Sequence, residues 1–173
     1  MLNMMQQSFS THTSKEASAL RWLWLSALII VLDQITKVIA NTYMALHETI
    51  ELAPFINLTL AYNEGAAFSF LSDAGGWQRW FFTVLAVTVS AVLVVWLRRL
   101  PPSEKFVAVA LALILGGAIG NVIDRVYLGY VIDFIDVYYA QAHWPAFNVA
   151  DSAISVGAVM LIWDALRGKQ SAV

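Results

Sequence analysis

The chain alternates long apolar runs with shorter polar segments, which is typical of a protein that crosses a membrane several times. Residues 80–97 and 106–123 contain no Asp, Glu, Lys or Arg, and each run can cross a hydrocarbon core of about 30 Å as a helix. Residues 20–43 and 146–165 form two further apolar runs, each interrupted by aspartate. The pattern therefore predicts four transmembrane helices.

The polar segments between these runs predict other structures. Residues 56–63 alternate apolar and polar side chains with the period of two of a half-buried strand. The Asn-Glu-Gly that ends this run is typical of a turn, and we expect a second strand at residues 66–71. Residues 125–145 are rich in Tyr and Trp, which prefer the lipid–water interface, so we expect a loop at the bilayer rim.

The cationic residues decide the orientation of the helices. Most of them lie at one end of the predicted bundle, namely Lys15, Arg21, Arg98, Arg99, Lys105, Arg167 and Lys169. Because cytoplasmic segments carry an excess of Lys and Arg, both termini are expected in the cytoplasm. The chain then divides into a polar cytoplasmic tail at residues 1–19, a single four-helix membrane domain at residues 20–168 and a cytoplasmic tail at residues 169–173.

Composition excludes several kinds of site. The chain has no cysteine, which rules out thiol catalysis, disulfides and thiolate metal sites. The three histidines, His12, His47 and His143, show no H-E-x-x-H spacing, so a zinc protease of that kind is not expected. The net charge of -2 decides little, because the position of a charge matters more than the sum in a membrane protein.

Asp133 and Asp151 are the candidate catalytic residues. Placing a carboxylate near the hydrocarbon core costs at least about 2.5–3.5 kcal/mol, so two of them at one membrane edge indicate a functional role. Two close carboxylates share one proton and can activate water. Asp151 alone could simply complement the dipole at the start of a helix. Asp136 is expected to be solvated in a mobile loop and to take no part in the pair.

Other polar residues interrupt the apolar runs. Asp33 and Lys37 are four residues apart and share a helix face. Of two interpretations, an internal ion pair in which Lys37 extends outward is favoured, and a polar element near the active site is the alternative. The G-x-x-x-G pattern at residues 116–120 allows close helix packing, and we expect packing within the chain rather than dimerisation.

Three polar residues follow that pattern on one helix face, Asn121, Asp124 and Arg125. A structural role is favoured for Asp124. Two interpretations of Arg125 remain open, a donor to a substrate carbonyl or headgroup phosphate and a member of a buried polar network. Asn148 shares a face with Asp151 at the start of the fourth helix, where Pro145 suits a helix start.

Five stretches occur together in one order: Asp33-Gln34-x-x-Lys37, Tyr62-Asn63-x-Gly65-Ala66-Ala67-Phe68-Ser69, Gly116-Gly117-Ala118-x-Gly120-Asn121-x-x-Asp124-Arg125, Val131-x-Asp133-Phe134 and Phe147-Asn148-x-Ala150-Asp151-Ser152. With them the chain resembles the lipoprotein signal peptidase family, also called signal peptidase II, from residue 20 to about residue 165. The resemblance implies a mainly α membrane protein with four transmembrane helices, a small extracytoplasmic β-sheet and a periplasmic loop.

The resemblance also implies an activity. Such an enzyme is an aspartic endopeptidase of the bacterial inner membrane, with its active site on the periplasmic side. It removes the signal peptide from a diacylglyceryl-modified prolipoprotein by cutting before the lipid-modified cysteine. The implied catalytic dyad is Asp133 and Asp151. The implied substrate-binding or supporting residues are Asn63, Gly65, Asn121, Asp124, Arg125, Asn148, Asp33 and Lys37.

The expected partners are the prolipoprotein and membrane lipid, without nucleic acid, metal or organic cofactor, and the chain is expected to be a monomer. We expect Asp133 to carry the shared proton at rest, because a helix N-terminus favours the charged form of Asp151. The alternative is a small ion or proton-coupled transporter, since intramembrane charges also line ion pathways. Against it, the two halves show no internal repeat and the polar residues cluster at one membrane edge.

Overall fold

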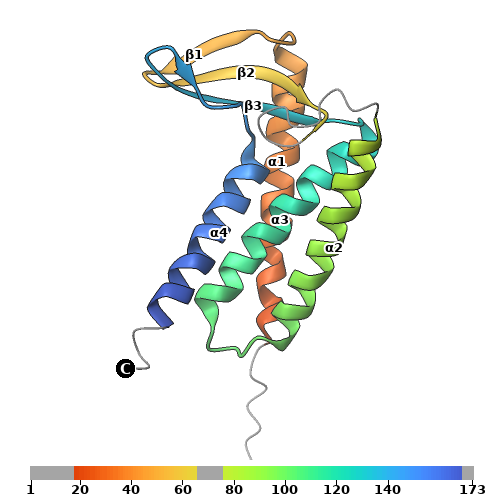
Figure 1. The fold of residues 1–173 in the computed structure, drawn as a ribbon, viewed down its shortest axis with the longest axis vertical. Coiled ribbons are helices and arrows are strands. Elements are labelled where there is room, and N and C mark those ends of the chain that lie inside the picture. The colour runs from red at the N-terminus through yellow and green to blue at the C-terminus, as the bar shows by residue number, and fades with distance from the viewer. Residues whose placement is uncertain (1–17, 66–75, 169–173) are drawn as a thin grey trace, which may run out of the picture.

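A bundle of four helices carries a small antiparallel sheet at one end (Figure 1). The computed structural model describes residues 18–65 and 76–168. Within these ranges four helices are long and apolar enough to cross a membrane, which confirms the prediction. They are η1 (Ala19–Trp22) continuing into α1 (Leu23–Tyr43), α2 (Trp77–Arg99), α3 (Lys105–Tyr127) and α4 (Val149–Gly168).

Helix α3 lies at the centre of the bundle. It packs against α1, α2 and α4, and in Figure 1 it runs between α2 and α4 with α1 behind it. Its most apolar window is 61% buried, whereas those of the other three helices are only 17–22% buried. The large apolar side chains that the outer helices leave exposed, such as Val38, Val84 and Val159, therefore face outward, where a bilayer would cover them.

Two glycines of α3 explain how closely the helices approach. A Cβ at Gly117 would overlap the carbonyl of Ala150 on α4. A Cβ at Gly120 would lie 2.6 Å from Asp33 Oδ2 on α1. Small residues of this kind allow close helix packing, and here both contacts lie within one chain. The structure thus confirms that the G-x-x-x-G pattern serves packing within the bundle.

The sheet is antiparallel, with the strands in chain order: β1 (Thr49–Ala53), β2 (Ile56–Asn63), β3 (Val131–Tyr139) and β4 (Ala142–His143). Strand β2 has the predicted bounds. The strand expected at residues 66–71 lies outside the described residues.

Strand β3 corrects the expectation of a loop at residues 125–145. The sequence pattern did not indicate this strand, because five of its first six residues are buried and so apolar and polar residues do not alternate. Alternation of apolar and polar residues indicates a strand with one solvent-exposed face, and the inner part of β3 has no such face.

The sheet is attached to the top of α1 by apolar and aromatic contacts. Ala40 of α1 packs in one buried cluster with Leu60 of β2 and Ile132 of β3. At the edge of this cluster Tyr62 stacks on Tyr130, with ring centroids 4.2 Å apart. These contacts place β3, and with it Asp133, directly above the helix bundle.

Candidate active site

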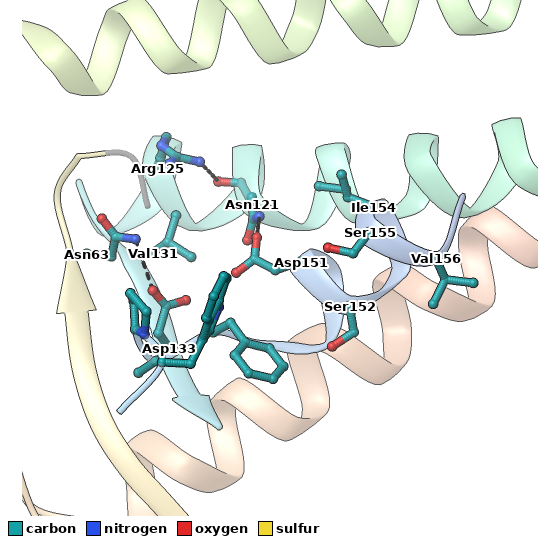
Figure 2. A pocket seen from close by; sticks show the side chains of 14 residues that line it. Asn63, Asn121, Arg125, Val131, Asp133, Asp151, Ser152, Ile154, Ser155 and Val156 are labelled. Carbon is teal, nitrogen blue, oxygen red and sulfur yellow. Dashed lines mark hydrogen bonds between the residues drawn. The ribbon is translucent and has the colours of Figure 1, made fainter. Parts of the chain in front are cut away.

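Asp133 and Asp151 line one pocket of about 530 Å³ where β3, α3 and α4 meet (Figure 2). Asp133 lies on β3, and Asp151 lies in the first turn of α4. The polar residues that line the pocket are Asn63, Asn121, Arg125, Asp133, Asp151, Ser152 and Ser155. The apolar ones are Val131, Trp144, Pro145, Ala146, Phe147, Ile154 and Val156. The structure therefore brings the two predicted catalytic residues to one cavity.

The start of α4 is fixed by two hydrogen bonds. Asn148 Oδ1 accepts from the backbone N–H of Asp151 at 2.8 Å, which is the geometry of an N-cap residue. Asp33 Oδ1, on α1, accepts from the backbone N–H of Ala150 at 2.9 Å. The helix therefore begins at Val149, later than the expected start at residue 146, and Pro145 precedes it.

The segment before α4 is tied to β3. Ile135 and Phe147 form a β-bridge, in which Phe147 donates to Ile135 O at 3.0 Å and Ile135 donates to Phe147 O at 2.8 Å. Because Asp133 and Asp151 lie on either side of this bridge in the chain, their spacing is set by local backbone contacts as well as by the bundle.

The Asp133 side chain is held by two amide donors. Asn63 Nδ2 donates to Oδ2 at 3.0 Å, and Asn148 Nδ2 donates to Oδ1 at 2.7 Å. Burial and, after it, the negative charge of Asp151 raise the pKa of Asp133 to about 7, although the two amides and the charge of Lys37 act in the opposite direction. Asp133 thus holds a proton over much of the range in which an ordinary aspartate is ionised.

The Asp151 side chain has a different environment. Asn121 Nδ2 of α3 donates to Asp151 Oδ1 at 2.8 Å. Its position in the first turn of α4 also favours a negative charge, because the free N–H groups of a helix start carry partial positive charge. Both effects favour the charged form of Asp151 and oppose the cost of burying a carboxylate.

Arg125 lines the pocket beside the pair. Its Nη2 donates to the carbonyl of Gly65 at 3.1 Å, and its guanidinium lies 5.5 Å from the centroid of the Phe82 ring. Its Nη1 makes only a long contact of 3.4 Å to the Asn121 carbonyl. Arg125 therefore joins a polar network and also faces the cavity, so both interpretations of this residue stay open.

Lys37 forms the expected pair with Asp33, with 2.8 Å between Nζ and Oδ2. It does not reach outward as predicted, because its Nζ also lies 2.9 Å from Asp124 Oδ2 and donates to Asn121 Oδ1 at 3.0 Å. An ammonium group has three N–H donors, and these contacts use all of them. Lys37 is only 1% exposed, so the ion cluster of Asp33, Lys37 and Asp124 lies inside the bundle.

The expectation that Asp136 is solvated is wrong. Asp136 is buried and accepts hydrogen bonds from Asn57 at 3.2 Å and, at the longer distance of 3.4 Å, from Thr59. His143 of β4 lies 2.9 Å from it on the other side. The pairing of β2 with β3 sets Asn57 opposite Asp136, so the aspartate ties three strands together. Asp136 is absent from the residues that line the pocket, in agreement with its exclusion from the pair.

Sequence reasoning gave no role to three residues near the site. Gln34 Nε2 donates to Asp124 Oδ1 at 2.9 Å and contacts Asp33 Oδ2 at 3.2 Å, so it supports the ion cluster. Ser152 and Ser155 line the pocket. A usable signal was present for Ser155, which lies four residues after Asp151 and so extends its polar face along an apolar helix.

Within residues 18–65 and 76–168 there is no cluster of three His, Asp or Glu side chains that could hold a metal ion. The carboxylates of Asp133 and Asp151 accept hydrogen bonds from amide groups, and that of Asp33 pairs with Lys37. Whether the reaction proceeds without metal stays a prediction.

Comparisons with known proteins agree with this geometry. A sequence model of the family described as signal peptidase (SPase) II matches residues 25–167. The chain belongs to the signal peptidase II family. This membership makes it an aspartic peptidase that processes lipoprotein signal peptides, and it gives no support to the transporter alternative.

Relatives in this family cover most of the chain. The lipoprotein signal peptidase of Pseudomonas putida is 58% identical over 154 residues, which are 88% of this chain and 90% of that protein. The lipoprotein signal peptidase of Acinetobacter baumannii is 60% identical over 143 residues, or 83% of this chain and 81% of that protein. A solved structure described as a bacterial membrane enzyme has a TM-score of 0.81 at 32% identity and covers 88% of this chain and 92% of its own.

Proposed function

We propose that this signal peptidase II family member cleaves lipoprotein signal peptides with Asp133 and Asp151 as its catalytic pair. The observation that carries the proposal is their joint position in one pocket with unlike partners: the pKa of Asp133 is raised to about 7, whereas Asp151 accepts a hydrogen bond from Asn121 in the first turn of α4, two features that favour its charged form. This asymmetry is what an aspartic peptidase requires, because one group must accept a proton while the other donates one.

The reaction follows from that division. Asp151, as the carboxylate, takes a proton from a water molecule whose oxygen attacks the scissile carbonyl carbon. Asp133, protonated, donates to the carbonyl oxygen as the tetrahedral intermediate forms. The intermediate then collapses: the C–N bond breaks, the leaving nitrogen takes the proton from Asp151, and Asp133 recovers its own. No metal or organic cofactor takes part.

The supporting residues divide by what they contact. Asn63 and Asn148 hold Asp133, and Asn121 holds Asp151. Arg125 faces the pocket and is assigned to the substrate backbone, because a guanidinium can donate to a peptide carbonyl that a cleavage site presents. Gly65 keeps Arg125 in place through its carbonyl. Asp33, Lys37 and Asp124 anchor the helices that carry these groups.

The substrate assigned to the pocket is a diacylglyceryl-modified prolipoprotein. The α4 wall of the pocket ends in Ile154 and Val156, and Trp144 lines it near β4, so the polar pair borders an apolar surface. Such a surface suits a lipid-modified cysteine whose chains stay in the bilayer. The protein is placed in the bacterial inner membrane as a monomer, with both termini in the cytoplasm and the sheet on the periplasmic side.

Asparagine substitution tests this assignment. Asp133→Asn and Asp151→Asn keep the shape of the side chain but cannot exchange the proton, so each purified variant should lose cleavage by about 10²–10⁴-fold. Glu51→Gln makes the same chemical change on the exposed strand β1 and should leave cleavage intact. Each variant is first checked for insertion and thermal unfolding. Substantial turnover by either folded aspartate variant would refute the catalytic pair.

A further inference from the structure

Lys37 is a buried cation that takes no part in the reaction steps above, although a single residue, Asn121, connects it to Asp151. Its Nζ donates to Asn121 Oδ1 at 3.0 Å, and Asn121 Nδ2 donates to Asp151 Oδ1 at 2.8 Å. We propose that Lys37 is a positioning residue: it orients the Asn121 amide toward Asp151 and thereby keeps the charge on Asp151 and the proton on Asp133. The inference rests on the proposed catalytic pair.

The orientation follows from the chemistry of an ammonium group. Lysine only donates hydrogen bonds, so Asn121 must turn its oxygen toward Lys37 and its NH₂ group toward the opposite side. Asn148 Nδ2 donates to the same Asn121 oxygen at 3.2 Å. The NH₂ group then faces Asp151. A cation on the carbonyl end and an anion on the NH₂ end polarise the amide in the same sense, which strengthens both hydrogen bonds.

Lys37 is fixed in its own position. Asp33 lies 2.8 Å and Asp124 2.9 Å from its Nζ, and the side chain is almost completely buried. The three donors are therefore shared between two carboxylates and the Asn121 oxygen. These contacts link α1 to α3, and the hydrogen bond from Asn121 to Asp151 extends them to α4. Lys37, Asn121 and Asp151 thus form a relay across three helices of the bundle.

The Asn148 amide that donates to Asp133 is oriented in a different way. Asn148 Oδ1 accepts from the backbone N–H of Asp151, so its NH₂ group faces Asp133. That amide is oriented by a neutral peptide group, whereas the Asn121 amide is oriented by a cation. The Asn121 amide should therefore be the stronger donor of the two. The charged groups packed around Lys37 and the pair are Asp33, Asp124, Arg125, Asp133 and Asp151.

The test removes Lys37 without changing the net charge of the ion cluster. With Lys37→Met and Asp124→Asn together, Asp33 alone keeps the cluster at -1, the sum of the three charges in the wild type. The acid limb of the kcat–pH profile should move up by about one pH unit, which is roughly a tenfold loss of kcat on that limb. KM for a lipidated peptide should change little, because no substrate contact is removed.

Gln34→Met is the matched control. Gln34 contacts Asp33, Asp124 and the Gly120 carbonyl but does not reach Asn121. This variant should lower the thermal midpoint while its acid limb stays at the wild-type position. The same shift in Gln34→Met as in the double variant would mean that general loosening of the cluster moves the limb, and the relay would be wrong.

A second variant covers the case in which the double variant does not fold. Asn121→Asp keeps an acceptor for Lys37 and replaces only the NH₂ group that faces Asp151. It too should move the acid limb upward. A folded variant of either kind with the wild-type limb would overturn the relay, even while Asp133→Asn and Asp151→Asn stay inactive. Activity in those two variants would instead refute the catalytic pair itself.

Discussion

Asp33 Oδ1 accepts a hydrogen bond from the backbone N–H of Ala150 at 2.9 Å, so a carboxylate of α1 caps the first turn of α4. The other oxygen of Asp33 pairs with Lys37. Helices α1 and α4 are therefore joined next to Asp151. Damage to this contact should reach the site without touching either catalytic residue.

Gly120→Ala tests that contact. The added Cβ would lie 2.6 Å from Asp33 Oδ2, and Asp33 can move away only by weakening its pair with Lys37 or its hydrogen bond to Ala150. Alanine gains about 1 kcal/mol of helix propensity over glycine, but overpacking costs about 1–3 kcal/mol. We expect a lower thermal midpoint together with reduced cleavage. Val126→Ala, on an exposed face of the same helix, should change neither, and a fully active Gly120→Ala enzyme would contradict this account.

The pH profile should report Asp133. Because its pKa is raised to about 7, cleavage should fall as the pH rises through about 7 and Asp133 loses its proton. Stability follows the same group: the folded state binds the proton more tightly than the unfolded chain, whose aspartates have their ordinary value of 3.8. The free energy of unfolding should therefore fall as the pH rises from about 4 to about 7.

Two measurements check this behaviour. The first is kcat/KM from about pH 5 to about pH 9 with purified enzyme. The second is thermal unfolding over the same range, in which Asp133→Asn should show a weaker dependence on pH than the wild type. An alkaline limb well above pH 8 would mean that the proton lies elsewhere.

Asp136→Ala should separate stability from catalysis. It removes the acceptor of Asn57 and Thr59 and the partner of His143, at a cost of about 1–3 kcal/mol for buried donors left unpaired. None of these residues lines the pocket, so cleavage well below the unfolding transition should persist. Thermal melts and cleavage assays on the same samples decide the matter. Loss of turnover by folded enzyme would give Asp136 a part in the chemistry.

Single cysteines test the topology, since the chain has none of its own. Glu51→Cys lies on the sheet and Ser103→Cys on the α2–α3 connection, at opposite ends of the bundle (Figure 1). A thiol reagent that cannot cross the membrane should label position 51 in intact spheroplasts and position 103 only after the membrane is opened. The reverse pattern would invert the orientation proposed here.

Lipidation of the substrate should matter for the rate. Each buried CH₂ contributes about 0.8 kcal/mol to membrane partitioning, so two acyl chains hold the cysteine at the depth of the pocket. Loss of only about 1.4 kcal/mol of this positioning slows cleavage about tenfold. A paired assay of lipidated and unlipidated prolipoprotein in one detergent measures the ratio. Equal rates would point to a peptidase that reads the peptide alone.

Local patterns in the sequence were enough for the helices, whose apolar runs are long enough to cross a bilayer, and for β2, whose side chains alternate between apolar and polar. They were also enough for the Asp33–Lys37 pair, whose spacing is set by a single helix. They failed for β3, which is buried on both faces along its inner part. They also failed for Lys37 and Asp136, whose partners on α3 and β2 are distant in the chain.

The links around Asp151 have a consequence for synthesis of the enzyme. Asp151 belongs to the last helix, yet its surroundings come from Asn121 on α3 and from Asp33 on α1, which caps its helix. A nascent chain with three helices inserted has Asp133 but no partner for it. Proteolytic activity therefore requires that α4 has been made and has packed against α1 and α3, and a chain that stops before α4 lacks the catalytic pair.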